Sequence, residues 1–334
     1  MFRYPVAWTS RTGLAFFLLP LAGLFGAAVA LRRFLYKAGL LNSERLPVPV
    51  IVVGNISVGG TGKTPLVLWL ATRLRENGYN PGIISRGYGG ANQTPHAVSA
   101  DSDAAQYGDE PVLLARRSDS PVWIGKDRAA AARALLAAHP DCNVIVSDDG
   151  LQHYRLARDV EIAVIDGARG LGNGWLLPAG PLREPPSRLA AVDAVVIRGP
   201  RTQVVAQAPA PYEMNLEPAG LRNLRDSGRC VAPSHLQGLR VHAVAGVGNP
   251  QQFFDTLTRL GIAHTPHAFA DHHPFAASDL AFSNCDAVVM TEKDAVKCER
   301  FASGMHCTYW ALQVDARIDD ALARHVLARI KTER

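Results

Sequence analysis

A glycine-rich run that ends in Gly62-Lys63-Thr64 is the part of this sequence with the clearest chemical meaning. Glycines allow backbone N–H groups to turn inward onto phosphate oxygens, a lysine can reach the β- and γ-phosphates, and a threonine hydroxyl can bind Mg²⁺. The standard phosphate-binding loop has glycine where this chain has Ser57, so we expect the neighbouring glycines to supply the turn. The alternative is a turn without function. The residues predicted to bind ATP are Ser57, Val58, Gly59, Gly60, Thr61, Gly62, Lys63 and Thr64.

Two adjacent acids, Asp148 and Asp149, end a hydrophobic run that begins at Asn143. A carboxylate at the end of such a strand can hold Mg²⁺ directly or through water. Ligands of open α/β sheets bind at the carboxyl ends of the strands, so these acids are expected beside the phosphate loop. We predict Thr64, Asp148 and Asp149 as Mg²⁺ ligands, with two acids in a surface turn as the alternative.

Further charged residues stand at the ends of predicted elements. Asp109 and Glu110 begin a predicted helix, where acids are expected electrostatically even without a function. Arg86, Lys126 and Arg128 are candidates to bind a transferred phosphoryl group or an anionic substrate, and solvated surface charges are the alternative.

A histidine pair, His272 and His273, is the remaining candidate for acid–base chemistry. On an extended segment the two side chains would point in opposite directions. Either could also be a metal ligand or a polar loop residue. No third ligand follows at metal-like spacing, so a zinc site is not predicted.

The elements that must position these residues follow from hydrophobic runs rich in β-branched residues. Buried strands are predicted at 49–53, 81–85, 121–125, 161–166 and 193–197, together with the run from 143 that ends in the acids. A helix is predicted after the phosphate loop, over 65–74. The loop from Gly167 to Arg188 is long for a compact domain, and such loops are usually functional. We therefore predict an α/β fold with a P-loop NTPase-like α/β/α domain.

The second half predicts a smaller α/β domain. Segments 212–216 and 228–232 are interpreted as two arms of a linking hairpin, followed by a strand from 240, a helix over 251–260 and a buried strand at 287–290. The Gly-x-Gly at 246–248 lacks the third glycine of a dinucleotide site, which we do not predict. The active site is expected between the two domains. The predicted divisions are 1–38, 39–202, 203–235 and 236–334.

The N-terminal stretch from Thr12 to Leu31 has no charged residue and is flanked by arginines. About 20 apolar residues can just cross a bilayer. A cleaved signal peptide, a spanning helix, an interfacial helix and a buried core helix are the possible interpretations. A phosphate loop needs cytosolic ATP, which argues against secretion. Whether 12–31 spans the bilayer or lies at its interface is left open.

Composition limits the function classes. The chain has 334 residues, is 48% hydrophobic and carries 35 basic against 30 acidic residues, a net charge of +5. This surplus is too small to indicate nucleic-acid binding, but it suits an anionic substrate or membrane surface. Five cysteines without a CxxC pair indicate neither a disulfide framework nor a zinc site, and favour a reducing compartment.

An ordered set of motifs resembles the tetraacyldisaccharide 4'-kinase family of lipid A biosynthesis. The set is V-G-N-I-S-V-G-G-T-G-K-T-P at 53–65, S-R-G-Y-G at 85–89, G-D-E-P at 108–111, S-D-D-G-L-Q-H at 147–153, W-L-L-P-A-G-P-L-R-E-P at 175–185, D-H-H-P-F at 271–275 and T-E-K-D at 291–294. The similarity covers nearly the whole chain after the N-terminal helix. The Ser57 departure is similar to a feature of this family.

The resemblance implies a function. The family transfers the γ-phosphate of ATP to the 4'-hydroxyl of a tetraacyl glucosamine disaccharide 1-phosphate, giving lipid IVA, at the cytoplasmic face of the bacterial inner membrane. It implies a two-stranded β linker between the domains, and a catalytic pair of Asp109 and His272, with His272 favoured over His273. Gln152, His153 and Glu184, and a substrate role for Glu110, are implied by the resemblance only.

The expected partners are therefore a lipid substrate and the membrane surface, with no nucleic acid and no obligate protein partner. Two alternatives stay open at this point. One is a different P-loop enzyme, such as a membrane-associated ATPase or a kinase of another small molecule. The other is a non-enzymatic module that changes shape with ATP.

Overall fold

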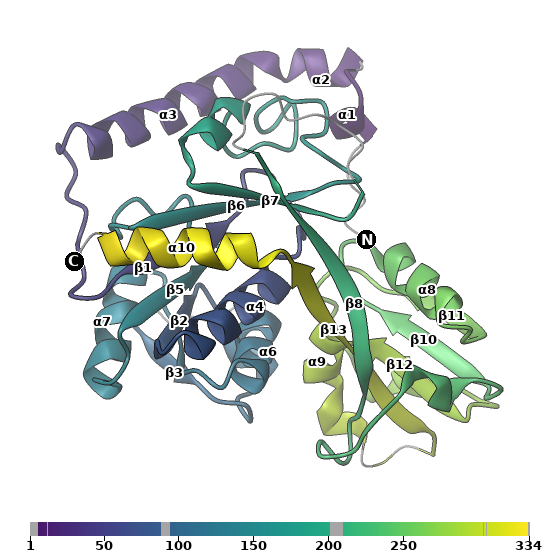
Figure 1. Cartoon of the computed structure of the whole chain (residues 1–334). Coiled ribbons are helices and arrows are strands. Elements are labelled where there is room, and N and C mark those ends of the chain that lie inside the picture. The colour runs from purple at the N-terminus through teal and green to yellow at the C-terminus, as the bar shows by residue number, and fades with distance from the viewer. Residues whose placement is uncertain are drawn as a thin grey trace.

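The computed structural model describes residues 6–11, 13–87, 94–200, 210–302, 304 and 306–332. Tyr88 and Gly89 of the 85–89 motif, residues 203–209 of the predicted linker and Thr12 lie outside these ranges. Within them, the strands form one hydrogen-bonded path in the order β11-β10-β12-β13-β8-β7-β6-β1-β5-β2-β4-β3, with β9 paired to β8. Figure 1 shows two bodies joined by β8 and β13.

The first body is the P-loop unit, built on a parallel sheet in the order β7-β6-β1-β5-β2-β4. Short β3 adds an antiparallel edge. The predicted strands are confirmed, with ends that differ by one or two residues. The strands are β1 (Val50–Gly54), β2 (Pro81–Ser85), β3 (His96–Val98), β4 (Val122–Ile124), β5 (Val144–Asp148), β6 (Val160–Asp166) and β7 (Ala194–Arg198).

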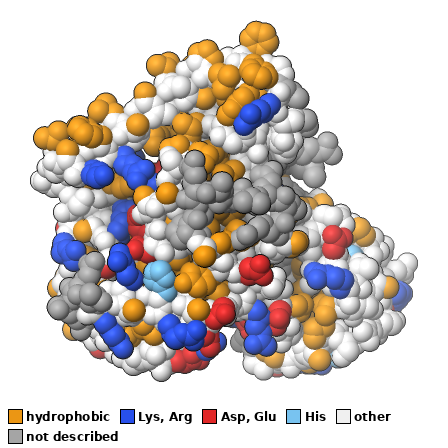
Figure 2. All heavy atoms as spheres, turned by 45° about the horizontal axis from the view of Figure 1, so that its top comes forward, with side chains coloured by type: hydrophobic (Ala, Val, Ile, Leu, Met, Phe, Trp, Pro, Cys, Tyr) orange, Lys and Arg blue, Asp and Glu red, His pale blue; other side chains and the backbone are white. Residues whose placement is uncertain are grey.

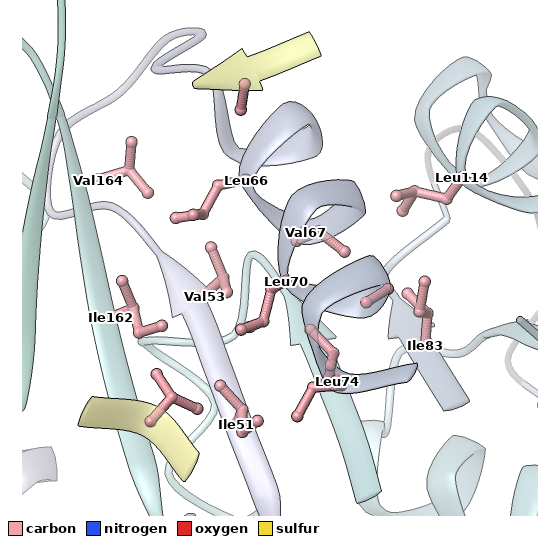
Figure 3. Close-up of a cluster of buried hydrophobic side chains, with 14 of the residues drawn as sticks. Ile51, Val53, Leu66, Val67, Leu70, Leu74, Ile83, Leu114, Ile162 and Val164 are labelled. Carbon is pink, nitrogen blue, oxygen red and sulfur yellow. The ribbon is translucent and has the colours of Figure 1, made fainter. Parts of the chain in front are cut away.

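Helices cover both faces of this sheet. Their bounds are α4 (Lys63–Glu76), α5 (Ala104–Tyr107), α6 (Asp109–Arg117), α7 (Arg128–Ala138), the 3-10 helix η1 (Pro186–Ala191) and α10 (Asp320–Thr332). On β1, Ile51 and Val53 pack against α4, while the alternating Val50 and Val52 face the α7 side. Figure 3 shows Leu66 and Leu70 of α4 directed at the sheet. Each such buried side chain stabilises the fold by about 1.5–3 kcal/mol, so β1 and α4 hold the loop between them at fixed ends.

The second body is the smaller unit, in which β10, β11 and β12 are parallel to one another and to β13. Its elements are the 3-10 helix η2 (Pro233–Leu236), β10 (Val241–Ala245), α8 (Pro250–Arg259), β11 (His264–Ala268), the 3-10 helix η3 (Ala277–Leu280), β12 (Ala287–Thr291) and α9 (Glu292–Ala302). Phe253 and Leu257 of α8 pack on one face of the sheet, and Ala295 and Cys298 of α9 on the other. The predicted helix at 251–260 and strand at 287–290 are confirmed.

The linker differs from the predicted hairpin. The long strands β8 (Tyr212–Asn223) and β13 (Thr308–Ile318) run antiparallel from one unit to the other, so Leu216 pairs with Ala316. The predicted second arm is only β9 (Cys230–Val231), which pairs with Leu221 and Arg222 at the far end of β8. Pairing 212–216 with 228–232 was wrong because local sequence does not reveal a partner about 100 residues away.

Helix α10 returns from the linker to the P-loop unit. Its side chains Leu322, Val326 and Ile330 belong to the same core as α4 and β1. Helix α10 therefore packs on the sheet of the P-loop unit, although it follows the elements of the smaller unit in the sequence. The divisions at 38, 202 and 235 stay predictions.

The N-terminal helices α1 (Val6–Thr9), α2 (Gly13–Phe17) and α3 (Leu19–Lys37) lie across one side of the P-loop unit (Figure 1). By length and composition alone α3 could cross a membrane, and only 6% of its apolar window is buried. Phe17 and Leu24 are 84% and 70% exposed. A buried core helix is therefore the wrong interpretation. Figure 2 shows hydrophobic side chains gathered along the top edge of the molecule, with Lys and Arg side chains near them.

Candidate active site

The phosphate loop joins the end of β1 to the start of α4. Gly59 and Gly62 have φ of 100° and 89°, a region that favours glycine. A Cβ on Gly62 would lie 2.6 Å from Cδ of Arg198, so both the backbone conformation and the close approach of this side chain favour glycine there. Ser57 forms an isolated antiparallel bridge with Leu182. The position that is glycine in the standard loop is thus held by the long loop 167–188.

The long loop makes further contacts with the phosphate loop. The backbone N–H of Val58 donates to the carbonyl of Pro181 at 2.9 Å, and the guanidinium of Arg169 contacts the carbonyl of Gly60. Its other side reaches the N-terminal helices: Trp8 donates to the carbonyl of Pro178, and Phe16 packs edge-on against Trp175. The prediction that this loop does more than connect two strands therefore has a structural basis.

The two acids after β5 differ in environment. Asp148 is 1% exposed; its Oδ2 accepts the Ser85 hydroxyl at 3.2 Å, while its Oδ1 is buried and has no hydrogen-bond partner in the described part of the chain. Asp149 adopts a left-handed backbone with φ of 50° and turns its side chain to the loop. Its Oδ1 lies 3.2 Å from Nζ of Lys63, and its Oδ2 lies 3.5 Å from Nη1 of Arg183.

Their acidities diverge accordingly. Burial and the charge of Glu110 raise the pKa of Asp148 above its ordinary value. Burial also disfavours the charge of Asp149, but Lys63 and Arg183 outweigh it and lower its pKa. A bound cation would give Oδ1 of Asp148 the partner that it lacks among the described residues. The residues predicted from the sequence to bind Mg²⁺ therefore fit such an ion. Among the described residues no cluster of three His, Cys, Asp or Glu side chains could hold a metal alone.

A second group of residues forms where α6 meets the smaller unit. Asp109 is the first residue of α6 and is 5% exposed. Its Oδ2 lies 3.0 Å from Nδ1 of His272, which follows β11 with a left-handed φ of 58°. His273 instead places Nε2 3.0 Å from Oδ2 of Asp279. The structure thus brings His272, and not His273, to Asp109.

The charges around Asp109 keep it ionised. Burial opposes ionisation, but His272, Lys293 and Lys297 outweigh it and lower the pKa of Asp109 to about 2. The hydrogen bond to Asp109 raises the pKa of His272 in turn. A buried carboxylate and an imidazole that is 37% exposed therefore share one hydrogen bond, an arrangement that can accept and stabilise a proton.

The two groups lie at one junction. A Cβ built on Gly248, in the loop after β10, would be 3.5 Å from Oδ2 of Asp271 and 4.0 Å from the backbone nitrogen of Gly60. The charge of Glu110 also reaches Asp148. The loop that carries His272 therefore approaches the phosphate loop, and Glu110 connects the two groups electrostatically.

The other predicted residues are placed in different ways. Arg128, the first residue of α7, is 2% exposed; burial lowers its pKa to about 10, and its charge acts on Asp148 and Asp149. It is therefore not a solvated surface charge, whereas Arg86 and Lys126 are exposed.

Two residues carried by the resemblance have supporting contacts. Gln152 donates to the carbonyl of Asn55 at 3.0 Å, beside the phosphate loop. Glu184 is buried with Tyr154 and Arg188.

Sequence reasoning missed four cations that the structure adds to the site. They are Arg169 and Arg183 of the long loop and Lys293 and Lys297 of α9. The available signals were the arginine-rich composition of 167–188 and the Thr-Glu-Lys-Asp run directly after a buried strand. Neither signal predicts which carboxylate each of these cations pairs with.

Comparisons with known proteins show the family of this chain. A family model described as LpxK, Tetraacyldisaccharide-1-P 4'-kinase, matches residues 14–331. The chain is 53% identical over 328 residues to a tetraacyldisaccharide 4'-kinase of Azoarcus sp. (strain BH72), covering 98% of this chain and 95% of the relative. It is 51% identical over 323 residues to that of Methylobacillus flagellatus, covering 97% and 94%. The crystal structure of LpxK from Aquifex aeolicus in complex with ATP is similar with a TM-score of 0.81 at 30% identity, covering 95% of this chain and 99% of that one.

Proposed function

The chain belongs to the tetraacyldisaccharide-1-P 4'-kinase family, and from this premise we propose that Asp109 and His272 carry the proton transfer of its reaction. The enzyme is a lipid A 4'-kinase that uses ATP. Family membership excludes both alternatives left open by the sequence, a P-loop enzyme of another class and a non-enzymatic switch.

In this reaction the 4'-oxygen of the disaccharide bonds to the γ-phosphorus of ATP, and the bond from that phosphorus to the β–γ bridging oxygen breaks. The hydroxyl proton must leave, because a protonated sugar hydroxyl is a poor nucleophile. A carboxylate within hydrogen-bond reach can take that proton. Asp109 is the base, since it is buried and its pKa of about 2 keeps it ionised at neutral pH. His272 donates from Nδ1 to Oδ2 of Asp109 and orients it.

The phosphate chain is assigned to the loop between β1 and α4. Lys63 and the backbone amides of the loop hold the β- and γ-phosphates, and Arg183 adds positive charge on the side of Asp149. Thr64, Asp148 and Asp149 are the residues that would hold Mg²⁺, supported by the unpartnered Oδ1 of Asp148 among the described residues. When bound, Mg²⁺ neutralises the negative charge of the phosphates.

The substrate-facing residues are assigned by exposure. Arg86 and Lys126 are exposed and suit the anionic disaccharide 1-phosphate, with Gln152 beside the loop. Arg128 is buried with a bond to the carbonyl of Gly125, so its role is to compensate the charges of Asp148 and Asp149.

The lipid explains the N-terminal helices. Each buried CH₂ of an acyl chain is worth about 0.8 kcal/mol, so a four-chain substrate stays in the bilayer and the enzyme must come to it. The exposed apolar face of α2 and α3, with Arg32, Arg33 and Lys37 at its end, suits that contact. We place the enzyme at the cytoplasmic face of the inner membrane, where ATP is present.

The single observation that carries the assignment of the catalytic pair is the 3.0 Å contact between His272 and Asp109 across the two units. The test is transfer of label from γ-labelled ATP to tetraacyldisaccharide 1-phosphate with Mg²⁺. Wild type should label the lipid, D109N should lose about 10²–10⁴-fold in kcat while still binding ATP, and D279N should keep its kcat. Label transfer by D109N at the wild-type rate would refute the assignment.

A further inference from the structure

We propose that Lys293 is a positioning residue of this kinase, whose ammonium group opposes a second proton at Nε2 of His272 and so favours the imidazole with its proton on Nδ1. This inference rests on the proposed function of the Asp109–His272 pair and adds a third group to it. The residue comes from the Thr-Glu-Lys-Asp run at 291–294, to which the reaction assigns no role so far.

The first and last residues of this run fix the start of α9. Asp294 is fully buried, and its Oδ2 accepts the Thr291 hydroxyl at 2.7 Å and the backbone N–H of Gly246 at 2.9 Å. The backbone N–H of Asp294 donates back to Oγ1 of Thr291 at 3.2 Å, as in a helix cap. The backbone N–H of His272 donates to the carbonyl of the same Gly246 at 3.3 Å. The start of α9 and the histidine loop are therefore anchored to one point at the end of β10.

The second residue of the run ties α9 to the P-loop unit. Glu292 contacts the guanidinium of Arg117 in α6, and its Oε2 accepts the backbone N–H of Val314 at 3.1 Å. One residue earlier in α6, Nη1 of Arg116 lies 2.7 Å from Oε2 of Glu299. These contacts set the position of α9 against α6, so the lysines of α9 meet the acids at the start of α6.

Lys293 then lies between three groups. Its Nζ is 3.0 Å from Oε1 of Glu110, 3.4 Å from Nε2 of His272 and 3.9 Å from Oδ1 of Asp271. An ammonium group has only donors, so Nε2 of His272 must be the acceptor in this contact. The imidazole proton therefore sits on Nδ1, which donates to the ionised Asp109 at 3.0 Å.

The balance of charge around the imidazole shows what Lys293 contributes. Asp109 and Asp271 favour protonation of His272, while Lys293 opposes it. Lys297, one turn further along α9, lies 3.7 Å from Asp109 and 3.1 Å from Asp294.

Among the described residues, the charged groups around the pair include Asp271, Glu110, Lys293, Lys297 and the buried Asp294. In this set Lys293 is the cation that contacts the imidazole itself. A doubly protonated His272 would place Nε2–H against that ammonium.

The protonation of His272 matters for the reaction. An imidazolium would pair with Asp109 as a full cation and would weaken the carboxylate that has to take the hydroxyl proton. Lys293 opposes that imidazolium, and its charge, which Glu110 meets at 3.0 Å, also helps to keep Asp109 ionised. Lys293 thereby widens the pH range over which Asp109 works with a neutral hydrogen-bond donor.

The test is the pH profile of kcat for wild type, K293M, K293R and K331M, where Lys331 is an exposed lysine of α10. Loss of the charge in K293M should move the rising limb to higher pH by about one pH unit and lower kcat at neutral pH about tenfold. K293R retains the charge and should keep the limb near its wild-type position, as should K331M. In an H272N background, K293M should cause no further shift of the pH profile of kcat.

Three results would overturn the inference. One is an unchanged kcat in K293M. Another is a lower kcat with the limb in place, which a merely structural lysine would give. The third does not depend on K293M: ¹⁵N NMR of histidine-labelled wild type, assigned with H272N, must show the Nδ1–H tautomer at neutral pH, and Nε2–H or imidazolium would contradict it. Full activity of H272A, which has no donor at this position, would instead refute the proposed pair, which separates the two failures.

Discussion

Nδ1 of His272 lies 3.0 Å from Oδ2 of Asp109, although 163 residues separate them in the chain. Asp109 begins α6 of the P-loop unit, and His272 follows β11 of the smaller unit. Each unit thus supplies one member of the pair. The docking of the units, which β8, β13 and the α6–α9 contacts maintain, sets the geometry of the proposed catalytic group.

The two adjacent histidines should differ in kinetic effect. H272A removes the donor to Asp109 and should lower kcat about 10²-fold. H273A should change kcat less than about threefold, because His273 contacts Asp279 and not the pair. Steady-state kinetics at saturating ATP distinguish them, and a larger loss in H273A would reverse the assignment.

Mg²⁺ dependence should follow Asp148. D148N removes the charge of a carboxylate whose Oδ1 is unpartnered among the described residues, and should raise the Mg²⁺ concentration for half-maximal activity about tenfold or more. The matched control is D141N, because Asp141 is exposed on the surface. A Mg²⁺ titration that leaves D148N and D141N alike would remove Asp148 from the metal site.

His153 should make the fold sensitive to acid. Burial, with nearby Arg128, lowers the pKa of His153 from 6.5 to about 4. The unfolded chain then binds a proton that the folded chain does not between about pH 6.5 and pH 4, so this histidine costs stability as the pH falls through that window. Denaturant unfolding of wild type and H153Q should show a smaller loss between pH 7.5 and pH 5 in the variant. Parallel curves would contradict this.

The apolar face of the N-terminal helices should bind lipid without stabilising the fold. F17S/L24S alters side chains that are 84% and 70% exposed, so the free energy of unfolding should change by less than about 1 kcal/mol. Partition onto anionic vesicles should weaken about 10²-fold, from about 3 kcal/mol of lost apolar burial. Binding is measured by sedimentation of the vesicles with the protein. The control is L239S, at a leucine of the smaller unit that is 37% exposed, and it should bind the vesicles like wild type. Undiminished binding of F17S/L24S would place the membrane contact elsewhere.

Helix α10 should contribute to the P-loop unit. Leu322 is fully buried in the core that contains α4 and β1, so L322A should lower the free energy of unfolding by about 2–5 kcal/mol. R324A alters a side chain that is 72% exposed and should be nearly neutral. Thermal unfolding with ATP present would report the loss; equal effects of both variants would mean that α10 does not pack as described.

Much of this protein was predictable because it is local in the chain. Strands β1, β2 and β4 to β7 follow from short hydrophobic runs, whereas the short edge strand β3 was not predicted, and the phosphate loop follows from glycines before Lys63. Asp148 and Asp149 were placed beside it because they end a parallel strand, and β5 pairs directly with β1. The pairing of Asp109 with His272 was expected from the family resemblance alone.

Tertiary structure decided what depends on segments distant in sequence. The partner of β8, the return of α10, the choice of His272 over His273 and the arrival of Lys293 at Glu110 all need the two units in contact. Periodicity and turn residues encode which element forms, because those forces act between near neighbours. They carry no information on which distant charges will share a buried volume, and there desolvation and close pairing set each pKa.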